Sequence, residues 1–267
     1  METITFSNQS YIPVLANWLA SMREIKRKNV VVFTLDKKTK RFVENSGFEA
    51  RSIKAEEGIG NFWRMRARCF LDLVDKGVAF VHSDADAIWL RNIPQNVFGT
   101  KDICFSQGTT HPPFAFKEVG FVVCCGLFMS KPTSGSLEFF RHLHANVEVT
   151  QDDQRSVNNI LRKQKTVWTY PKNGYTVALP KGKSITSWES ALTGYCEGLD
   201  LPLRVLPHWA VQRAIDTHAK ADQAYVKHFL SPKKPDRKLR MFERHGLLFL
   251  KSDWHTVEDP KSLDDYL

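Results

Sequence analysis

The sequence predicts an α/β protein with a Rossmann-like, mostly parallel sheet, flanking helices and an irregular second half. Two observations carry this prediction. Strand-like and helix-like segments alternate from residue 4 to residue 86, which is typical of a parallel sheet with helices on its faces. Residues 29–36 form a valine-rich run, which is typical of a strand buried on both sides.

Apolar spacing and turn residues define the elements of the first half. Short apolar runs predict strands at residues 4–6, at residues 29–36 and directly before Asp84. Helical spacing and helix-ending residues predict helices at residues 11–22, 37–46 and 61–75. On the third helix, the residues expected to face the core are Phe62, Met65, Cys69 and Leu73, with Phe70 as a further candidate.

The second half is less regular. Strands are expected at residues 103–106 and 120–129, and helices at 134–145 and 152–163. Short strands and loops are expected at residues 167–206, with further short segments at 224–230 and 247–250. Because no internal repeat or linker interrupts the chain, we expect residues 1–267 to form a single domain.

The composition and the absence of common motifs exclude only some classes of function. The chain has 267 residues and a net charge of +9. Such a charge indicates attraction to anions, which include nucleic acids, anionic membranes and phosphorylated small molecules. The sequence contains no P-loop, no dinucleotide-binding glycine motif and no nucleophile elbow, which disfavours the three corresponding enzyme classes.

The termini and the cysteines bear on location. The N-terminus lacks the basic and apolar regions of a signal peptide, and no apolar run is long enough to span a membrane. Five cysteines, an odd number without zinc-site spacing, favour a reducing compartment. We expect a cytoplasmic protein, or a Golgi-lumenal catalytic domain if an anchor has been removed from a longer chain.

The segment Asp84-Ala85-Asp86 is the main functional candidate. It follows an apolar strand, and the two aspartates are separated by one residue. In an extended segment both carboxylates point the same way and repel each other unless a cation lies between them. Because Mg²⁺ and Mn²⁺ prefer carboxylate and phosphate oxygens, the segment predicts a metal-bridged diphosphate site. The simpler alternative is a solvated turn.

Three further residues could bind the same ligand. Asn8 and Asp36 follow other predicted strands, and open α/β sheets bind ligands at the carboxyl ends of their strands. Asp36 could equally cap the helix that follows it. Arg64, Arg66 and Arg68 lie on the helix before Asp84, where one of them, with Arg64 as the chosen candidate, could reach a phosphate and at least one is expected on a solvated face.

The second half adds four candidates, each with a simpler alternative. Asp153 and Gln154 could reach a polyhydroxylated substrate or simply start a helix. His228, in an apolar run, could be a third metal ligand or an ordinary core residue. Lys238 belongs to a basic cluster that could neutralise a diphosphate. Because Pro232 and Pro235 interrupt that region, an exposed basic loop is the alternative.

Residues 78–92, V-A-F-V-H-S-D-A-D-A-I-W-L-R-N, resemble the D-x-D region of the nucleotide-diphospho-sugar transferase family. Other matching parts are N-W-L at 17–19, the strand at 31–36, C-G-L-F-M at 125–129, D-Q-x-x-x-N from 153 and, weakly, K-H-F at 227–229. The resemblance implies a glycosyltransferase type-A fold, Mn²⁺ or Mg²⁺ as cofactor and a UDP-sugar as donor. It also implies a glycan or other hydroxyl acceptor, retention of configuration and no nucleic-acid partner.

Together with the candidates above, the resemblance implies the following roles. The metal ligands would be Asp84, Asp86 and His228. The donor would be bound by Asn8, Asp36, Arg64, Asp84, Asp86 and Lys238. The catalytic residues, facing the sugar or acceptor, would be Asp153 and Gln154. Residues 1–100 would bind the nucleotide sugar and residues 101–267 would face the acceptor.

Two other functions remain open at this point. In a haloacid-dehalogenase-like phosphatase, Asp84 would be the nucleophile and Asp86 the acid. Ile88 and Trp89 disfavour this because such sites need a small or hydroxylated residue there. A nucleic-acid-binding protein would explain the charge, but the basic residues are spread and no recognition motif is present.

Overall fold

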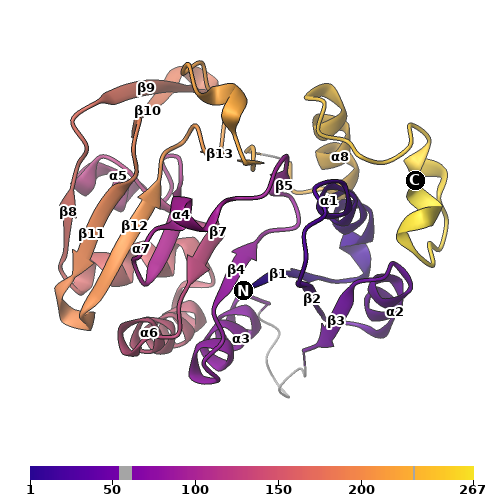
Figure 1. The fold of residues 1–267 in the computed structure, drawn as a ribbon, viewed down its shortest axis with the longest axis horizontal. Coiled ribbons are helices and arrows are strands. Elements are labelled where there is room, and N and C mark those ends of the chain that lie inside the picture. The colour runs from indigo at the N-terminus through magenta and orange to yellow at the C-terminus, as the bar shows by residue number, and fades with distance from the viewer. Residues whose placement is uncertain (54–61, 231) are drawn as a thin grey trace.

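The computed structural model describes residues 1–53, 62–230 and 232–267. Its centre is a nine-stranded sheet (Figure 1). From one edge to the other the strands are β3 (Glu49–Ser52), β2 (Val30–Thr34), β1 (Glu2–Ser7), β4 (Phe80–Ser83), β7 (Val123–Ser130), β6 (Ile103–Gln107), β12 (Leu201–Leu206), β11 (Leu192–Cys196) and β8 (Thr166–Thr169). The first four strands are parallel to one another, and β7 runs antiparallel to β4. The predicted α/β fold is therefore confirmed.

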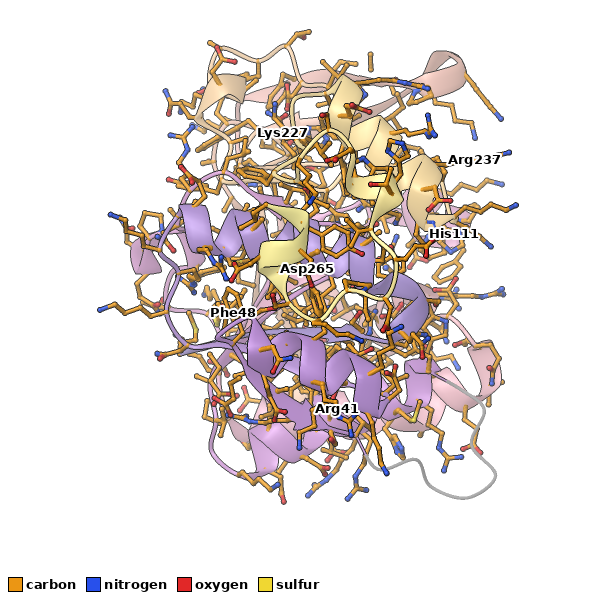
Figure 2. The ribbon with its side chains drawn as sticks, turned by 90° about the vertical axis from the view of Figure 1, so that its right-hand side faces the viewer. Arg41, Phe48, His111, Lys227, Arg237 and Asp265 are labelled. Atoms are coloured by element: carbon orange, nitrogen blue, oxygen red, sulfur yellow. The ribbon has the colours of Figure 1, made fainter. Side chains whose placement is uncertain are left out.

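Helices cover both faces of the sheet. One apolar cluster lies under α1 (Ile12–Glu24), α2 (Lys37–Asn45) and α8 (Pro235–Arg244), with the C-terminal segment packed against it. The other lies under α3 (Phe62–Asp75), α6 (Ser134–Thr150) and α7 (Asp153–Lys163). Figure 2 shows the C-terminal segment around Asp265 on the side of the molecule that carries α2 and α8. Two cores, one per face, result from side chains that alternate along each strand.

Two small sheets and several short helices complete the structure. β13 (Val211–Gln212), β14 (Val226–Lys227) and β5 (Ile88–Trp89) form one sheet, and β9 (Gly174–Leu179) pairs with β10 (Lys183–Trp188). The short α-helices are α4 (Gln95–Phe98) and α5 (Pro113–Val119). The 3₁₀ helices are Gln9–Tyr11, Pro180–Gly182, Glu197–Leu199, Ala221–Gln223, Trp254–Thr256 and Leu263–Tyr266. Pairing of β14 with β5 brings His228 next to the segment that follows β4.

The core face of α3 differs from its prediction. Met65 and Cys69 are only half-buried, whereas Arg66 and Phe70 are buried. Phe70 packs against Phe6, Phe80 and Phe128, so the large aromatic side chains decide which face of the helix meets the sheet. Residue 61, where the helix was expected to begin, lies outside the described residues.

The basic cluster after Pro232 forms a helix and not the loop considered as its alternative. Pro235 lies in the first turn of α8, where a missing N–H costs nothing because first-turn amides have no intrahelical acceptor. Leu239 and Phe242 turn into the core, and Lys238 is buried with them. The other basic residues of the helix, including Arg237 and Arg240, lie on the solvent-facing side of an amphipathic helix.

Residues 247–250 form neither a helix nor a strand, contrary to expectation. Instead, the Asn17 side chain donates to the carbonyl of Leu247 at 3.0 Å and accepts from the amide of Phe249 at 2.7 Å. One buried amide on α1 thus replaces a sheet partner for this segment. Across the part of the chain that the structure describes, no helix has the length and apolarity required to span a membrane. All five cysteines are free.

Candidate functional site

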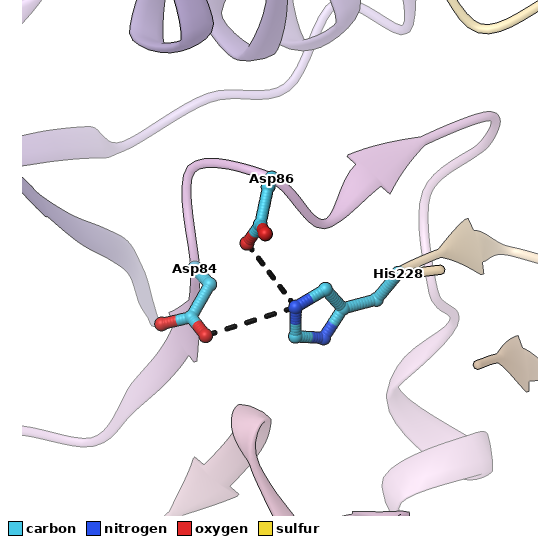
Figure 3. A group of neighbouring side chains, drawn as sticks. All are labelled: Asp84, Asp86 and His228. Atoms are coloured by element: carbon cyan, nitrogen blue, oxygen red, sulfur yellow. Dashed lines mark ion pairs between the residues drawn. The ribbon is translucent and has the colours of Figure 1, made fainter. Parts of the chain in front are cut away.

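Asp84 and Asp86 lie at the carboxyl end of β4, in a tight turn. The Asp84 amide continues the sheet by donating to the Gly126 carbonyl at 2.7 Å, and the Ala87 amide then donates to the Asp84 carbonyl at 2.9 Å. The two carboxylates therefore converge through a turn, and not through the alternation of an extended strand. Figure 3 shows both of them facing the imidazole of His228.

Ser83, the last residue of β4, fixes the start of this turn. Its hydroxyl accepts hydrogen bonds from the indole N–H groups of Trp18, at 3.1 Å, and Trp89, at 3.0 Å. The same hydroxyl donates to the Asp84 carbonyl at 3.2 Å. All three side chains of this clamp are buried. The tryptophans in the matching motifs thus hold the aspartate turn in place from α1 and β5.

The cluster Asp84, Asp86 and His228 offers three ligand atoms that all lie within 4.8 Å of one another. The Nε2 atom of His228 is 3.1 Å from Asp86 Oδ1 and 3.7 Å from Asp84 Oδ2. Two carboxylates and one imidazole suit Mn²⁺ well and Mg²⁺ in part, because Mg²⁺ prefers oxygen ligands alone. These residues therefore fit the divalent cation that the resemblance implies.

Buried basic side chains hold both aspartates ionised. Burial opposes ionisation of Asp84, but Arg66, whose Nη1 lies 2.7 Å from Oδ1, and His82 keep the pKa of Asp84 below its ordinary value. Burial likewise opposes ionisation of Asp86, but His228 and the hydrogen-bonded Lys238 keep its pKa well below the ordinary value. Both carboxylates are thus charged at neutral pH and ready to bind a cation.

His82 gives the site a testable pH dependence. Burial lowers the pKa of this ring from 6.5 to about 4. The unfolded chain therefore binds a proton on this ring more tightly than the folded protein does. As the pH falls from 6.5 toward 4, the free energy of unfolding decreases by about 3 kcal/mol. A phenylalanine fits the aromatic surroundings of this ring. We expect His82→Phe to reduce the pH dependence of the free energy of unfolding over this pH range. Denaturant unfolding at several pH values measures this, and exposed His255→Phe is the control; an unchanged slope in His82→Phe would contradict the assignment.

Gly126 leaves room for the cluster. A Cβ atom on this residue would lie 2.0 Å from Cε1 of His228 and 2.7 Å from Oδ2 of Asp84. Because both neighbours are ligand side chains, they would have to move apart.

We therefore expect Gly126→Ala to weaken Mn²⁺ binding about 10- to 100-fold, the range found when support of a metal ligand is lost. Calorimetric titration measures this, and Gly120→Ala on the loop after α5 controls for a general loss of stability. Gly126→Ala that binds Mn²⁺ like the unaltered protein would show that the crowding is relieved elsewhere.

A cavity of about 350 Å³ opens beside the two aspartates. Its lining combines polar groups of Asn8 and Ser10, the rings of Tyr11 and Trp63, and the charged groups of Arg66, Asp84, Asp86 and Lys238. Volumes of this order accommodate small ligands and cofactors. The cavity thus combines aromatic surface, hydroxyl and amide groups, and charged side chains, of which Arg66 and Lys238 could contact an anion.

Arg66, and not the chosen candidate Arg64, is the arginine of α3 that reaches the site. Its guanidinium bonds both Asp84 and Asp153 and lies 4.5 Å from the ring centroid of Trp63. Arg64, the predicted donor-binding residue of this helix, pairs instead with Glu148 at 2.8 Å and is not among the cavity residues. The spacing of Phe62, Arg66 and Phe70 is the feature of the sequence that indicates the position of Arg66, because it places one arginine on an apolar face of the helix.

The other candidates take several positions. Asn8 lines the cavity, and its Oδ1 accepts from the Ser10 hydroxyl at 2.8 Å. Asp36 caps α2 by accepting from the Thr39 amide at 2.7 Å. It also accepts from the Gln9 amide at 2.7 Å, so it ties the tips of β1 and β2 together. The structure thus gives Asp36 a structural role, and its contact with a donor stays a prediction.

The start of α7 separates the two predicted catalytic residues. Asp153 is buried against Arg66, whereas the side-chain Nε2 of Gln154 donates to the His111 carbonyl at 2.6 Å. Asp152 caps the helix by accepting from the Arg155 amide at 2.8 Å. Asn158 pairs with both backbone groups of Val123 at 3.0–3.1 Å and so fixes α7 to β7. The guanidinium of Arg66 thereby connects Asp153 to Asp84 of the cation site.

The chain is similar to known sugar transferases. The family model of the nucleotide-diphospho-sugar transferases matches residues 25–241. A UDP-D-xylose:L-fucose alpha-1,3-D-xylosyltransferase of Arabidopsis thaliana is 22% identical over 149 residues, which cover 47% of this chain and 41% of that protein. The match therefore spans less than half of the plant enzyme.

Two solved structures of the galactosyltransferase LgtC share the fold. One is a complex with donor and acceptor sugar analogues, and the other is an active-site mutant. Both have TM-scores of 0.52, at 13% and 12% identity, and the match covers 96% of this chain and 99% of theirs. This likeness shows a glycosyltransferase type-A fold. Since the family model covers most of the sequence and the fold agrees with it, the chain belongs to the nucleotide-diphospho-sugar transferase family.

Proposed function

We propose that the protein is a metal-dependent glycosyltransferase that moves a hexose or pentose from a UDP donor to a hydroxyl group of a glycan. The observation that carries the proposal is the convergence of Asp84, Asp86 and His228 at the edge of a cavity that also holds Arg66 and Lys238. UDP as the nucleotide is supported by the name of the plant relative, which uses UDP-D-xylose. Retention of configuration rests on the resemblance to the family.

Charge is the main contribution of these residues to the reaction. A bound Mn²⁺ or Mg²⁺, held by Asp84, Asp86 and His228, would neutralise the donor diphosphate and the negative charge of the leaving group. Lys238 and Arg66 supply further positive charge to the same cavity, where burial strengthens its effect. Departure of UDP is the step that this arrangement assists.

Asp153 is proposed to face the donor sugar. Its carboxylate is fixed by Arg66, which also holds Asp84, so it lies one guanidinium away from the metal ligands. A carboxylate there can accept sugar hydroxyl hydrogen bonds and stabilise positive charge on the ring. Gln154 makes its described hydrogen bond to the His111 carbonyl, and its catalytic role stays a prediction.

The assignment of donor and acceptor binding to different parts of the chain is also a proposal. Residues 1–100 would supply most of the nucleotide-sugar site, and residues 101–267 the acceptor side. His228 and Lys238 cross this division, because Lys238 lines the donor cavity and His228 lies beside the two aspartates that line it. The compartment, cytoplasm or Golgi lumen, is testable by imaging the tagged full-length protein.

A donor panel tests the proposal. The protein is incubated with UDP-xylose, UDP-galactose, UDP-glucose or GDP-mannose, with a sugar acceptor, in Mn²⁺ and again in EDTA. We expect UDP release from a UDP-sugar in Mn²⁺ only, and NMR of the product is expected to show the anomeric configuration of the donor. Phosphate release from p-nitrophenyl phosphate without any nucleotide release would favour the phosphatase hypothesis instead.

A further inference from the structure

The guanidinium of Arg213 lacks a hydrogen-bond or ion-pair partner within the described residues. Its Nε and Nη1 atoms are buried and make no hydrogen bond there. None of the ion pairs that arginines form among the described residues includes it. Burying such a group costs free energy, because the hydrogen bonds to water are lost and nothing replaces them. The fold therefore leaves a cation for which a ligand can supply the acceptor atoms.

A buried histidine holds the backbone that carries this guanidinium. β13 ends at Gln212, and the amides of Arg213 and Ala214 both donate to His208 Nε2, at 3.0 and 3.2 Å. Because this nitrogen accepts, Nδ1 carries the ring hydrogen and donates to Asp216 Oδ2 at 2.7 Å. Both side chains of this pair are buried. The turn after β13 is therefore fixed from the interior of the protein.

A cavity of about 380 Å³ is lined by Arg213. Its walls come from the end of β9, the segments that follow β13 and β14, and α8 (Figure 1). Most of the lining is apolar, and two of these side chains, Ile215 and Leu230, are 63% and 45% exposed. Thr217 and His245 are the other polar side chains of the lining, and no carboxylate of the described residues belongs to it. An apolar site with a guanidinium suits a ligand that carries a negative charge.

This cavity lies next to the donor cavity but has no lining residue in common with it. His228, after β14, lies beside the metal-binding aspartates, and the next residue, Phe229, lines this cavity. On α8, Lys238 lines the donor cavity and Met241 lines this one. All the lining residues fall within residues 178–245, in the part of the chain expected to face the acceptor. Its position therefore favours the acceptor as the ligand.

We propose that this cavity binds the acceptor and that Arg213 recognises an oxyanion on it, a carboxylate or a phosphate group. The inference deepens the proposed function and rests on it. A guanidinium can bind either group through two parallel hydrogen bonds. The acceptor class is thus an acidic glycoside, whose charged group pairs with Arg213 while its less polar part contacts the apolar walls.

The first test uses small probes and needs no sugar transfer. Benzoate and phenyl phosphate combine an apolar ring with an oxyanion, and benzyl alcohol is the neutral control. In NMR with ¹⁵N-labelled arginine, the side-chain signal of Arg213, assigned with Arg213→Met, is expected to shift with one or both anions and not with the alcohol. Because the side chain makes no hydrogen bond within the described residues, Arg213→Met is expected to fold.

The affinity for the anion should fall about 10- to 100-fold in Arg213→Met, since a charge-assisted hydrogen bond is lost. Arg240→Gln, on the exposed side of α8, controls for general attraction to a basic protein and should leave this affinity unchanged. Absence of a shift of the Arg213 signal with either anion, or equal anion affinity in Arg213→Met, would overturn the proposal.

The second test compares acceptors in the presence of a UDP-sugar and Mn²⁺. The acceptors are p-nitrophenyl β-D-glucoside, its 6-phosphate and p-nitrophenyl β-D-glucuronide. We expect kcat/KM to be at least about tenfold higher for an acidic acceptor, and this ratio to approach one in Arg213→Met. The preferred acid distinguishes phosphate from carboxylate. Preference for the neutral glucoside, or an acid preference that persists in Arg213→Met, would contradict the inference. Absence of UDP release from every UDP-sugar would instead overturn the proposed function, whereas the probe experiment would still decide whether the cavity binds an oxyanion.

Discussion

Replacing Asp86 by asparagine is expected to abolish metal binding and to lower sugar transfer by at least about a thousandfold. The substitution keeps the shape of the side chain but removes the charge that Lys238 and His228 share. The side chains of these two partners are only 8% and 6% exposed, and within the described residues their shortest ion-pair contacts are with Asp86, while His228 also lies 3.7 Å from Asp84. Stability is expected to fall by about 3 kcal/mol because a buried charge is left unpaired.

The measurements are Mn²⁺ titration, UDP release and denaturant unfolding of the same preparation. Asp72→Asn is the control because Asp72 also forms an ion pair, with Arg68 at 2.9 Å, but lies half-exposed on α3 away from the cavity. It should bind Mn²⁺ and transfer sugar normally. Full transfer activity in a folded Asp86→Asn variant would refute the assignment of the cation site.

Arg66→Gln is expected to lower transfer about 100- to 1000-fold and to destabilise the fold by about 3–5 kcal/mol. Arg66 is the shared partner of Asp84 and Asp153, and its side chain is only 4% exposed. Without it, the carboxylates of Asp84, which lines the cavity, and of Asp153 lose their hydrogen-bonded cation. Asp84 would then orient poorly toward a metal, and Asp153 would no longer be held toward the donor.

Arg64→Gln provides a sharp comparison, since it makes the same change two residues earlier on α3. Arg64 pairs with Glu148, whose side chain is 58% exposed, and such pairs contribute about 0–1 kcal/mol. We therefore expect nearly normal stability and transfer. UDP release and urea unfolding of both variants compare them directly. Loss of activity in Arg64→Gln together with an active Arg66→Gln would restore Arg64 as the donor-binding residue.

Most of the fold is predictable from the sequence because its signals are local. The valine-rich run at residues 30–34 and the apolar run before Asp84 become β2 and β4, and the predicted helices become α1, α2, α3, α6 and α7. The D-x-D segment is also visible, since two aspartates after a buried strand need a cation or solvent. Local pattern therefore identifies the elements and the carboxyl ends where ligands bind.

The remaining features depend on contacts between distant segments. Which face of α3 is buried is decided by packing of Phe70 against Phe6 and Phe128, so the choice of Arg66 over Arg64 is not readable from spacing alone. Pro235 can start a helix as well as break one, and only the core positions of Leu239 and Phe242 settle it. The role of Gly126 appears only when His228 is placed opposite it.

Calorimetric titration of UDP in Mn²⁺, and again in EDTA, tests the central claim of a metal-bridged nucleotide site most directly. The account predicts micromolar binding of UDP in Mn²⁺ that is lost in EDTA, with GDP bound more weakly under the same conditions. The Asp86→Asn variant should show no binding in either buffer. Binding of UDP that is equally tight in EDTA, or no binding of either nucleotide with Mn²⁺ present, would contradict a site in which Asp84, Asp86 and His228 hold the diphosphate through a metal ion.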